Sequence, residues 1–144
     1  FLCKRQCAGT IMKYFLDTNI LSYIVKGKYP NILEHMKKVP AQCICIPSVV
    51  KAEIEFGARK SDNYDKLMMT YMRLLEPFDI KDFDSDASYW YGIIRERLSK
   101  KGIIIGPNDL MIASIVLANN GTLITHNTDE FKRIEELRLE DWTI

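Results

Sequence analysis

The sequence predicts an α/β protein with a central, mainly parallel sheet. Short apolar runs typical of buried strands alternate with longer segments in which apolar residues recur at helical spacing. The four runs are residues 13–16 (KYFL), 43–46 (CICI), 77–80 (PFDI) and 122–125 (TLIT). This alternation indicates strands that pair mainly in parallel, with helices packed around them.

The first half of the chain is expected to form four helices. They are residues 19–25, 30–39, 48–58 and 64–75. Pro30 suits the first position of a helix, Ser48 is able to cap the third helix, and Pro77 follows the end of the fourth.

The second half is expected to add two long helices, a short one and a terminal strand. The long helices are residues 84–101 and 108–120. Gly102 is a suitable stop for the first, and Gly106 with Pro107 opens the second. The second is apolar almost all round, which predicts a central position. Phe131 marks the short helix, and Trp142 is expected to pack against the terminal strand.

Composition indicates an ordinary globular protein. The chain has 144 residues, of which 47% are apolar and 27% charged, enough for a sizeable core. No apolar run approaches the roughly 18 residues that cross a bilayer, so no membrane contact is expected. Residues 1–11 lack the apolar stretch of a signal peptide. We interpret them as a leader, non-native or disordered, outside a single domain of residues 12–144.

The charge balance argues against a globally basic nucleic-acid binder. The net charge of +1 falls to −1 without the leader, which holds Lys4 and Arg5 and no acid. Any polyanion must therefore be bound by local basic clusters. Cys43 and Cys45 alternate along one expected strand, a spacing that favours two buried, reduced thiols and a cytoplasmic location.

Three acids are expected at one edge of the sheet. Asp17 ends the first strand, although strands and cores both avoid aspartate, and ligands of open α/β sheets bind outside the carboxyl ends of the strands. Glu53 lies about 7.5 Å along its helix and can reach back to this edge, whereas Glu55 points away. Asp109 lies in the first turn of its helix, where the dipole favours an ionised carboxylate of low pKa.

These three acids indicate a functional site only if they lie close together. Glu53 or Asp109 alone would be an ordinary helix charge, but carboxylates brought within a few ångströms repel one another unless a cation or raised pKa values offset the repulsion. Oxygen ligands favour Mg²⁺ or Mn²⁺, and such a site is suited to phosphoryl chemistry.

From Met12 to its end the chain resembles the PIN domain family, and within it the VapC-type toxins of bacterial toxin–antitoxin pairs. The matching stretches are FLDTNIL (15–21), PSVVKAEIEFG (47–57), IGPNDLMIAS (105–114) and LITHNTDEFKRIEELRLEDW (123–142). The resemblance implies a PIN-like three-layer α/β/α sandwich. It also implies a metal-dependent endoribonuclease in which Asp17, Glu53 and Asp109 hold Mg²⁺ or Mn²⁺ and carry out hydrolysis.

The resemblance also indicates supporting residues around the metal. Thr18 or Asn19 would support the metal shell, and Thr125 would be a polar ligand of the same edge. A fourth acid of the family corresponds to Asn127, whose amide binds a metal-bound water without adding charge. Asp129 either takes part or simply starts the short helix.

Local basic residues are candidates for RNA contacts. They are Lys51 and Arg59 near the second acid, and Arg95 on the long helix. The alternative is that these exposed charges only keep the helices soluble. His126 is expected to be a structural residue of the edge.

The resemblance implies three partners: an RNA substrate, a second copy in a homodimer, and a VapB-like antitoxin. The RNA is expected to be a structured one such as tRNA, whose cleavage would inhibit translation and growth. Unpaired carboxylates form a natural receptor for an arginine of the antitoxin. DNA would be bound only indirectly, through the antitoxin.

Other acidic α/β proteins fit less well. A haloacid dehalogenase phosphatase needs Asp-x-Asp at the first strand, where this chain has Asn19, and a receiver domain needs a phospho-acceptor aspartate that CICIPS does not supply. The remaining alternative is a catalytically silent PIN-fold binding module, which Asn127 favours and the three retained acids oppose.

Overall fold

Five parallel strands form the sheet around which the described chain is arranged. In the computed structural model, residues 12–144 are described, and our interpretation of residues 1–11 lies outside them. The strands are β1 (Tyr14–Leu16), β2 (Ile44–Pro47), β3 (Asp79–Lys81), β4 (Thr122–Ile124) and β5 (Arg138–Glu140), in the spatial order β3-β2-β1-β4-β5. All four neighbouring pairs are parallel, which confirms the predicted sheet.

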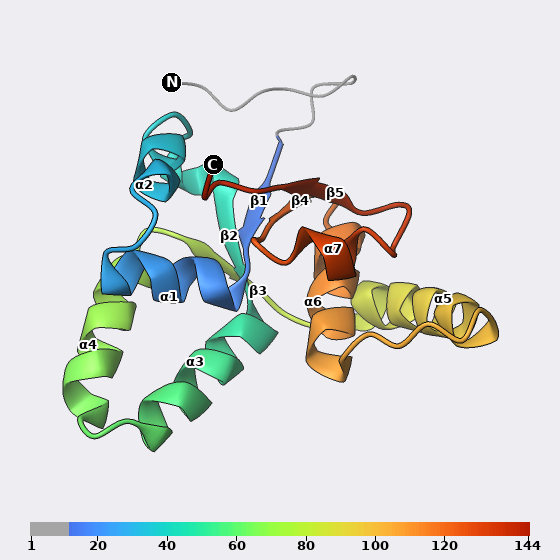
Figure 1. The fold of residues 1–144 in the computed structure, drawn as a ribbon, viewed down its shortest axis with the longest axis horizontal. Coiled ribbons are helices and arrows are strands. Elements are labelled where there is room, and N and C mark those ends of the chain that lie inside the picture. The colour runs from blue at the N-terminus through green and yellow to red at the C-terminus, as the bar shows by residue number, and fades with distance from the viewer. Residues whose placement is uncertain (1–11) are drawn as a thin grey trace.

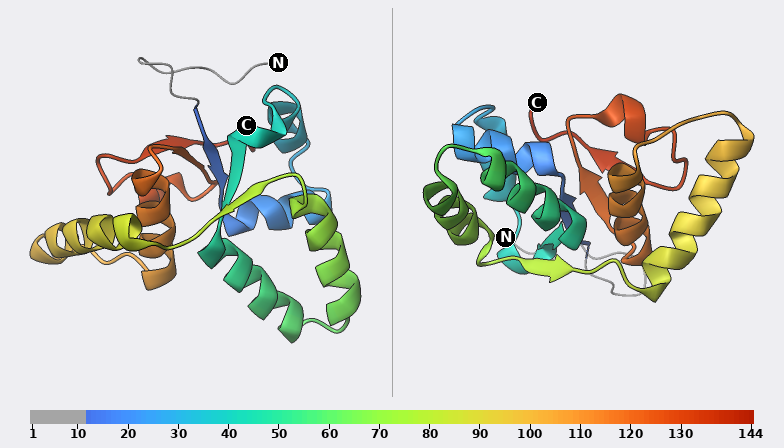
Figure 2. Two further views of the ribbon diagram at one scale, coloured as in Figure 1. Left: turned by 180° about the vertical axis from the view of Figure 1, so that it is seen from behind. Right: turned by 90° about the horizontal axis from the view of Figure 1, so that it is seen from below.

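Helices cover both faces of this sheet. They are α1 (Thr18–Lys26), α2 (Asn31–Met36), α3 (Ser48–Lys60), α4 (Tyr64–Leu75), α5 (Ser85–Lys100), α6 (Pro107–Ala118) and α7 (Thr128–Phe131), with a 3₁₀ turn, η2 (Ala41–Cys43), before β2. Helices α1, α3 and α4 lie to one side of the strands, and α5 and α6 lie to the other (Figures 1 and 2). The predicted three-layer α/β/α sandwich is therefore confirmed.

The central strand is buried because helices cover it on both sides. Phe15 and Leu16 of β1 have no exposed surface, and Tyr14 pairs with Ile44 of β2 and with Thr122 of β4. Strands covered on both faces read as continuous apolar runs instead of alternating ones. This is why the short run in β1 was recognisable in the sequence.

The order of the strands creates a crevice beside β1. The chain passes from β1 to β2 on one side and later returns to β4 on the other, so the direction of winding reverses between β1 and β4. In open parallel sheets, ligands bind at such a reversal, outside the carboxyl ends of the strands. Asp17 and Thr125 directly follow these two strands.

Helix α6 brings the third acid to the same edge. It precedes β4 and runs antiparallel to it, so its first turn lies at the carboxyl edge of the sheet. Gly106 precedes the helix and Pro107 is its first residue, as predicted. Residues Ile112 to Val116 are fully buried, which agrees with the predicted central position.

Several local predictions need correction. Ser48 does not cap α3, because Pro47 occupies the capping position and Ser48 is the first helical residue. Helix α2 is shorter than residues 30–39, and β3 begins two residues later than the predicted run. Cys45 is a free, buried thiol as expected, whereas Cys43 is disulfide-bonded, so the prediction of two reduced thiols is wrong at Cys43.

No helix within residues 12–144 has both the length and the apolar character needed to cross a membrane.

Close packing of the turn before β4 against β1 gives a stability prediction. A Cβ at Gly121 would lie 2.5 Å from the buried ring of Phe15 and 3.2 Å from the carbonyl of Lys13. Gly121→Ala should therefore lower the free energy of unfolding by about 1–3 kcal/mol, as overpacking does. Urea denaturation followed by circular dichroism measures this.

Gly92 provides a matched control for that substitution. It lies inside α5, and an added Cβ would meet no atom within 4 Å. Gly92→Ala should stabilise the protein by about 0.5–1 kcal/mol through helix propensity. Equal effects of the two substitutions would show that the turn does not press on β1.

Candidate active site

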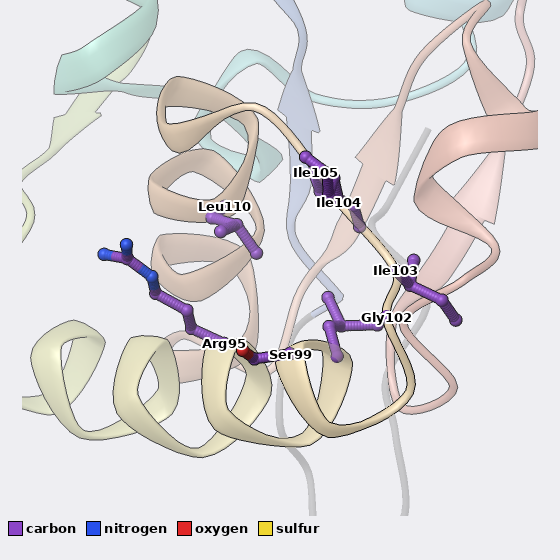
Figure 3. Close-up of a pocket in the computed structure, with 8 residues that line it drawn as sticks. Arg95, Ser99, Gly102, Ile103, Ile104, Ile105 and Leu110 are labelled. Atoms are coloured by element: carbon purple, nitrogen blue, oxygen red, sulfur yellow. The ribbon is translucent and has the colours of Figure 1, made fainter.

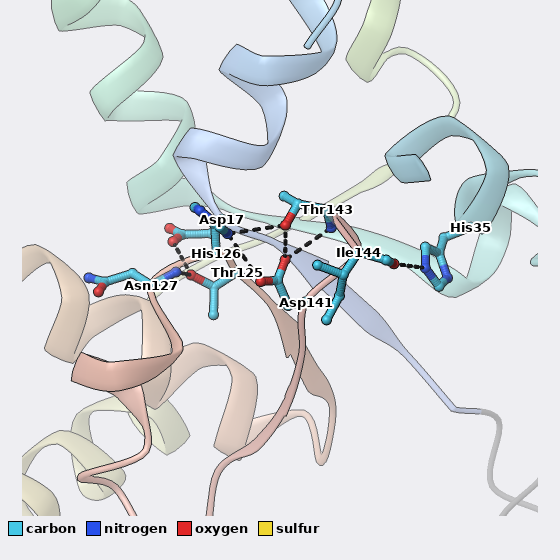
Figure 4. Close-up of polar contacts among 8 residues, drawn as sticks. All are labelled: Asp17, His35, Thr125, His126, Asn127, Asp141, Thr143 and Ile144. Atoms are coloured by element: carbon cyan, nitrogen blue, oxygen red, sulfur yellow. Dashed lines mark hydrogen bonds and ion pairs between the residues drawn. The ribbon is translucent and has the colours of Figure 1, made fainter. Parts of the chain in front are cut away.

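Asp17 is a buried carboxylate fixed by hydrogen bonds at the end of β1. Its exposure is only 6%. Oδ1 accepts a 2.8 Å hydrogen bond from the backbone amide of Thr18, and Oδ2 accepts one of 2.8 Å from the hydroxyl of Thr125 (Figure 4). Asp17 is thus the N-cap of α1 as well as the end of a strand, which explains how an acid is held at this position.

Burial raises the pKa of Asp17 above its ordinary value. The hydrogen bonds from Thr125 and Thr18 oppose this effect, and the nearby carboxylates of Glu53 and Glu130 add to it. The direction of the shift shows that the protein stabilises the charge of Asp17 less well than water does.

Glu53 approaches Asp17 through a shared neighbour. Its Oε1 accepts a 2.5 Å hydrogen bond from the hydroxyl of Thr18, whose amide is bound to Asp17. Its Oε2 accepts a longer one, of 3.5 Å, from the side-chain amide of Asn108 on α6. Glu55 points away and accepts a hydrogen bond from the hydroxyl of Tyr64, as the helical spacing predicted.

Asp109 is the most perturbed acid of the site. Burial, together with nearby carboxylates, raises its pKa to about 7. The carboxylates are those of Glu130, Asp17 and Glu53, in decreasing order of effect. The carboxyl of Glu130 also shares a hydrogen bond with Asp109. The predicted low pKa is therefore wrong, because desolvation and like charges outweigh the helix dipole.

Glu130 is a fourth acid that the sequence analysis missed. It lies on α7, and its Oε2 accepts a 2.6 Å hydrogen bond from the side-chain amide of Asn127. Asn127 occupies the N-cap of α7 and Glu130 follows three residues later, so the two face the same side. This capping-box spacing is the signal that would have identified Glu130.

Asp129 does not join the acidic cluster. Its side chain is 92% exposed and forms an ion pair of 3.1 Å with Lys132. Asn19 is exposed on α1 and makes none of the hydrogen bonds that connect the acids. Asn127, in contrast, contacts the cluster through Glu130, and its backbone amide donates to the hydroxyl of Thr125.

The three basic residues predicted to contact RNA lie outside the cluster of acids. Arg59 stacks on Tyr64 and lies 3.7 Å from the carboxylate of Glu55. Lys51 lines a groove between α3 and α4. Arg95 donates to the hydroxyl of Tyr91 and borders an apolar pocket between α5 and the segment leading to α6 (Figure 3). None of the three contacts an acid of the cluster.

The C-terminal residues close over the end of β4. His126 Nδ1 lies 3.0 Å from Asp141 Oδ2, and the hydroxyl of Thr143 donates to Asp141 Oδ1 (Figure 4). Burial acts to raise the pKa of Asp141, but hydrogen bonds from Thr143 and His126 outweigh it, so this pKa lies below its ordinary value. His35 donates to the last carbonyl, that of Ile144.

This hydrogen-bond network helps to hold Thr125, and through it Asp17, in position. His126 directly follows Thr125, the residue that fixes Asp17, and the backbone amide of Thr125 donates to the carbonyl of Glu140 in β5. His126 is thus a structural residue of the edge, as expected.

The acids have the donor chemistry for a hard divalent cation. None of the ion pairs within residues 12–144 involves Asp17, Glu53, Asp109 or Glu130, so no lysine or arginine balances their charge. Burial and the neighbouring acids instead raise the pKa values of Asp17 and Asp109. Carboxylate oxygens are the ligands that Mg²⁺ and Mn²⁺ prefer. Within residues 12–144, however, no group of three or more His, Cys, Asp or Glu side chains is placed so that it could hold a metal ion.

Comparison with known proteins shows the family of this chain and agrees with its fold. The sequence matches the PIN domain family over residues 14–137. It is 42% identical over 134 residues to ribonuclease VapC2 of Rickettsia felis, covering 91% of this chain and 98% of that one. It is 33% identical over 133 residues to the tRNA(fMet)-specific endonuclease VapC of Shigella flexneri, covering 92% and 100%.

A solved structure shows the same fold. The structure of VapBC2 from Rickettsia felis, bound to a DNA fragment from its promoter, contains a chain that superposes with a TM-score of 0.84 at 38% identity, covering 91% of this chain and 99% of that chain. The chain belongs to the PIN domain family. Within that family it groups with the VapC ribonucleases, which confirms the predicted resemblance.

The raised pKa of Asp109 predicts how stability depends on pH without metal. The pKa is about 7 in the folded protein and about 3.9 in the unfolded chain, so the folded state binds more protons between these values. Stability should therefore fall as pH rises from 4 to 8. Asp109→Asn should remove part of this loss and stabilise the protein at pH 8.

Urea unfolding in a chelator at several pH values measures this effect. Asp129→Asn is the matched control, because Asp129 is exposed and its substitution should leave the pH dependence unchanged. An undiminished loss of stability in Asp109→Asn would contradict the assignment.

Proposed function

We propose that this chain is the toxin of a toxin–antitoxin pair and a metal-dependent endoribonuclease that cuts a structured RNA such as tRNA, inhibiting translation and growth. The observation that carries the proposal is the cluster of Asp17, Glu53, Asp109 and Glu130 at the crevice beside β1. A relative named as a tRNA(fMet)-specific endonuclease supports the choice of RNA.

Asp17, Glu53 and Asp109 would hold Mg²⁺ or Mn²⁺. A divalent ion bound there supplies activation of a water and neutralises charge on the scissile phosphate. The chain's own residues prepare the site: Thr18 and Thr125 fix Asp17, and Thr18 with Asn108 fixes Glu53.

Proton transfer is assigned to the pair of Asp109 and Glu130. Glu130 adjoins Asp109 at the edge of the metal-holding acids, so one of these carboxylates would orient the attacking water or accept its proton. Hydrolysis would then leave a 5′-phosphate and a 3′-hydroxyl, with no covalent intermediate on the protein.

The alternative of a catalytically silent binding module has less support. Its argument was that Asn127 replaces an acid of the family. Glu130 restores a carboxylate to the cluster and is held there by Asn127 itself. The amide therefore orients a fourth acid.

The proposed partners follow from the charge of the site. Unpaired carboxylates are a receptor for an arginine, so an antitoxin segment that carries one would cover the site. VapBC complexes among the solved relatives support a VapB-like antitoxin, through which promoter DNA would be contacted. We further propose a homodimer that acts in the cytoplasm.

Asp17→Asn tests the proposed chemistry. It removes a negative charge from the cluster and should lower cleavage of a total small-RNA pool at least 100-fold and abolish growth arrest. Folding should be retained, because the amide oxygen still accepts from the backbone amide of Thr18 and the amide nitrogen is able to donate to the hydroxyl of Thr125. Cleavage is measured with Mg²⁺, with Mn²⁺ and with chelator.

Two outcomes would contradict this proposal. Equal cleavage or equal toxicity of folded Asp17→Asn would exclude Asp17 from the chemistry. A lack of cleavage by the antitoxin-free wild-type protein with either metal would favour the binding module.

Neighbouring acids on α7 provide a matched pair of variants. Glu130→Gln should reduce cleavage about 10-fold or more, because it removes the carboxylate with the largest electrostatic effect on Asp109. Asp129→Asn should leave cleavage unchanged, because Asp129 faces solvent. Rates are compared on one purified RNA, and a larger loss for Asp129→Asn would reverse the assignment of the two acids.

A further inference from the structure

One half of the cleft beside the acids is apolar, which the chemistry of hydrolysis does not require. This cleft has a volume of about 560 Å³. Its polar side consists of Thr18, Glu53 and Asn108, and its apolar side is lined by Val49, Ala52, Phe56 and Met111. The volume is in the usual range of small-molecule sites.

Two helices form the walls of this cleft. Residues 49, 52, 53 and 56 are spaced i, i+3, i+4 and i+7 on α3, so they form one stripe along the helix. Asn108 and Met111, three residues apart on α6, form the facing wall. Each wall places a polar side chain next to apolar ones. A ligand that fills the cleft therefore contacts polar and apolar side chains together.

Phe56 is a large apolar side chain that the packing of the fold leaves exposed. Its exposure is 66%, whereas the other apolar face of α3 is buried through Val50, Ile54 and Ala58. The ammonium group of Lys60, one turn further along α3, lies 5.1 Å from the centre of the Phe56 ring. The ammonium group thus lies over one face of a ring that is largely exposed, so the ring offers a stacking surface to a nucleobase and the cation is close enough for its phosphate.

We propose that this cleft binds one unpaired RNA base, which stacks on Phe56 beside the phosphate to be cut. This inference rests on the proposed function and extends it, since it assigns the substrate an unpaired nucleotide at the cleavage site. Met111 closes the opposite side, and Lys60 contacts the phosphate backbone. A base inside a continuous duplex stacks on its neighbours and does not reach Phe56.

Binding to a cleavage-deficient protein tests the stacking contact. The probe is a single-stranded RNA of eight nucleotides that carries one 2-aminopurine, moved along the strand, and the protein is Asp17→Asn with Mg²⁺. Stacking should quench the fluorescence at one position of the probe. Adding Phe56→Ala should weaken binding about 10-fold and remove the quenching, while Phe56→Trp should retain both.

Two controls separate stacking from general damage. Met72→Ala removes a comparably exposed apolar side chain from α4, outside the cleft, and should change nothing. An abasic nucleotide at the quenched position should weaken binding to the protein that retains Phe56. With this abasic probe, the further substitution Phe56→Ala should change the affinity very little.

The result also distinguishes failure of this inference from failure of the proposed function. If the wild type cleaves RNA while Phe56→Ala binds and cleaves equally well, the stacking site is overturned and the nuclease remains. If the probe is quenched but the wild type does not cleave, the base site stands and the nuclease is overturned. Absence of probe binding overturns the base site. Sedimentation showing that Phe56→Ala converts a dimer into monomers overturns it too, because Phe56 would then be covered by a second copy of the chain.

Discussion

The mutual repulsion of four carboxylates at one edge of the sheet is the constraint on which the site depends. Parallel strands place their carboxyl ends together, and helices α3, α6 and α7 bring three further acids to the end of β1. No basic side chain of the described chain pairs with these acids. Threonine and asparagine side chains hold these carboxylates, and burial together with the neighbouring charges raises the pKa values of Asp17 and Asp109.

Asp17, Glu53 and Asp109 could be predicted from the sequence because their positions follow from topology. Alternating strands and helices imply a parallel sheet, and in such a sheet each acid near a strand end or a preceding helix start reaches the same edge. The same reasoning placed Gly106 and Pro107 at the start of α6. Local sequence was sufficient where one element alone decides the geometry.

Glu130 and the pKa of Asp109 depend on contacts between elements, which explains why they were missed. Choosing between Asp129 and Glu130 requires knowing which side of α7 faces α6, and Asp129, for which the sequence left both roles open, is exposed. The dipole of α6 is a local effect, whereas burial and three carboxylates from other elements determine the pKa of Asp109. Arg59 and Arg95 each donate a hydrogen bond to a nearby tyrosine, away from the acids, and their contact with RNA stays a prediction.

The contacts of His126 extend the support of Asp17 to a segment that contains none of the four acids. Asp141 and Thr143 bind His126, which directly follows Thr125, and Thr125 fixes Asp17. The position of Asp17 therefore depends on residues that follow β5 as well as on β1 and β4. A substitution or a ligand that displaces residues 141–143 would alter the acidic edge without contacting any of the acids.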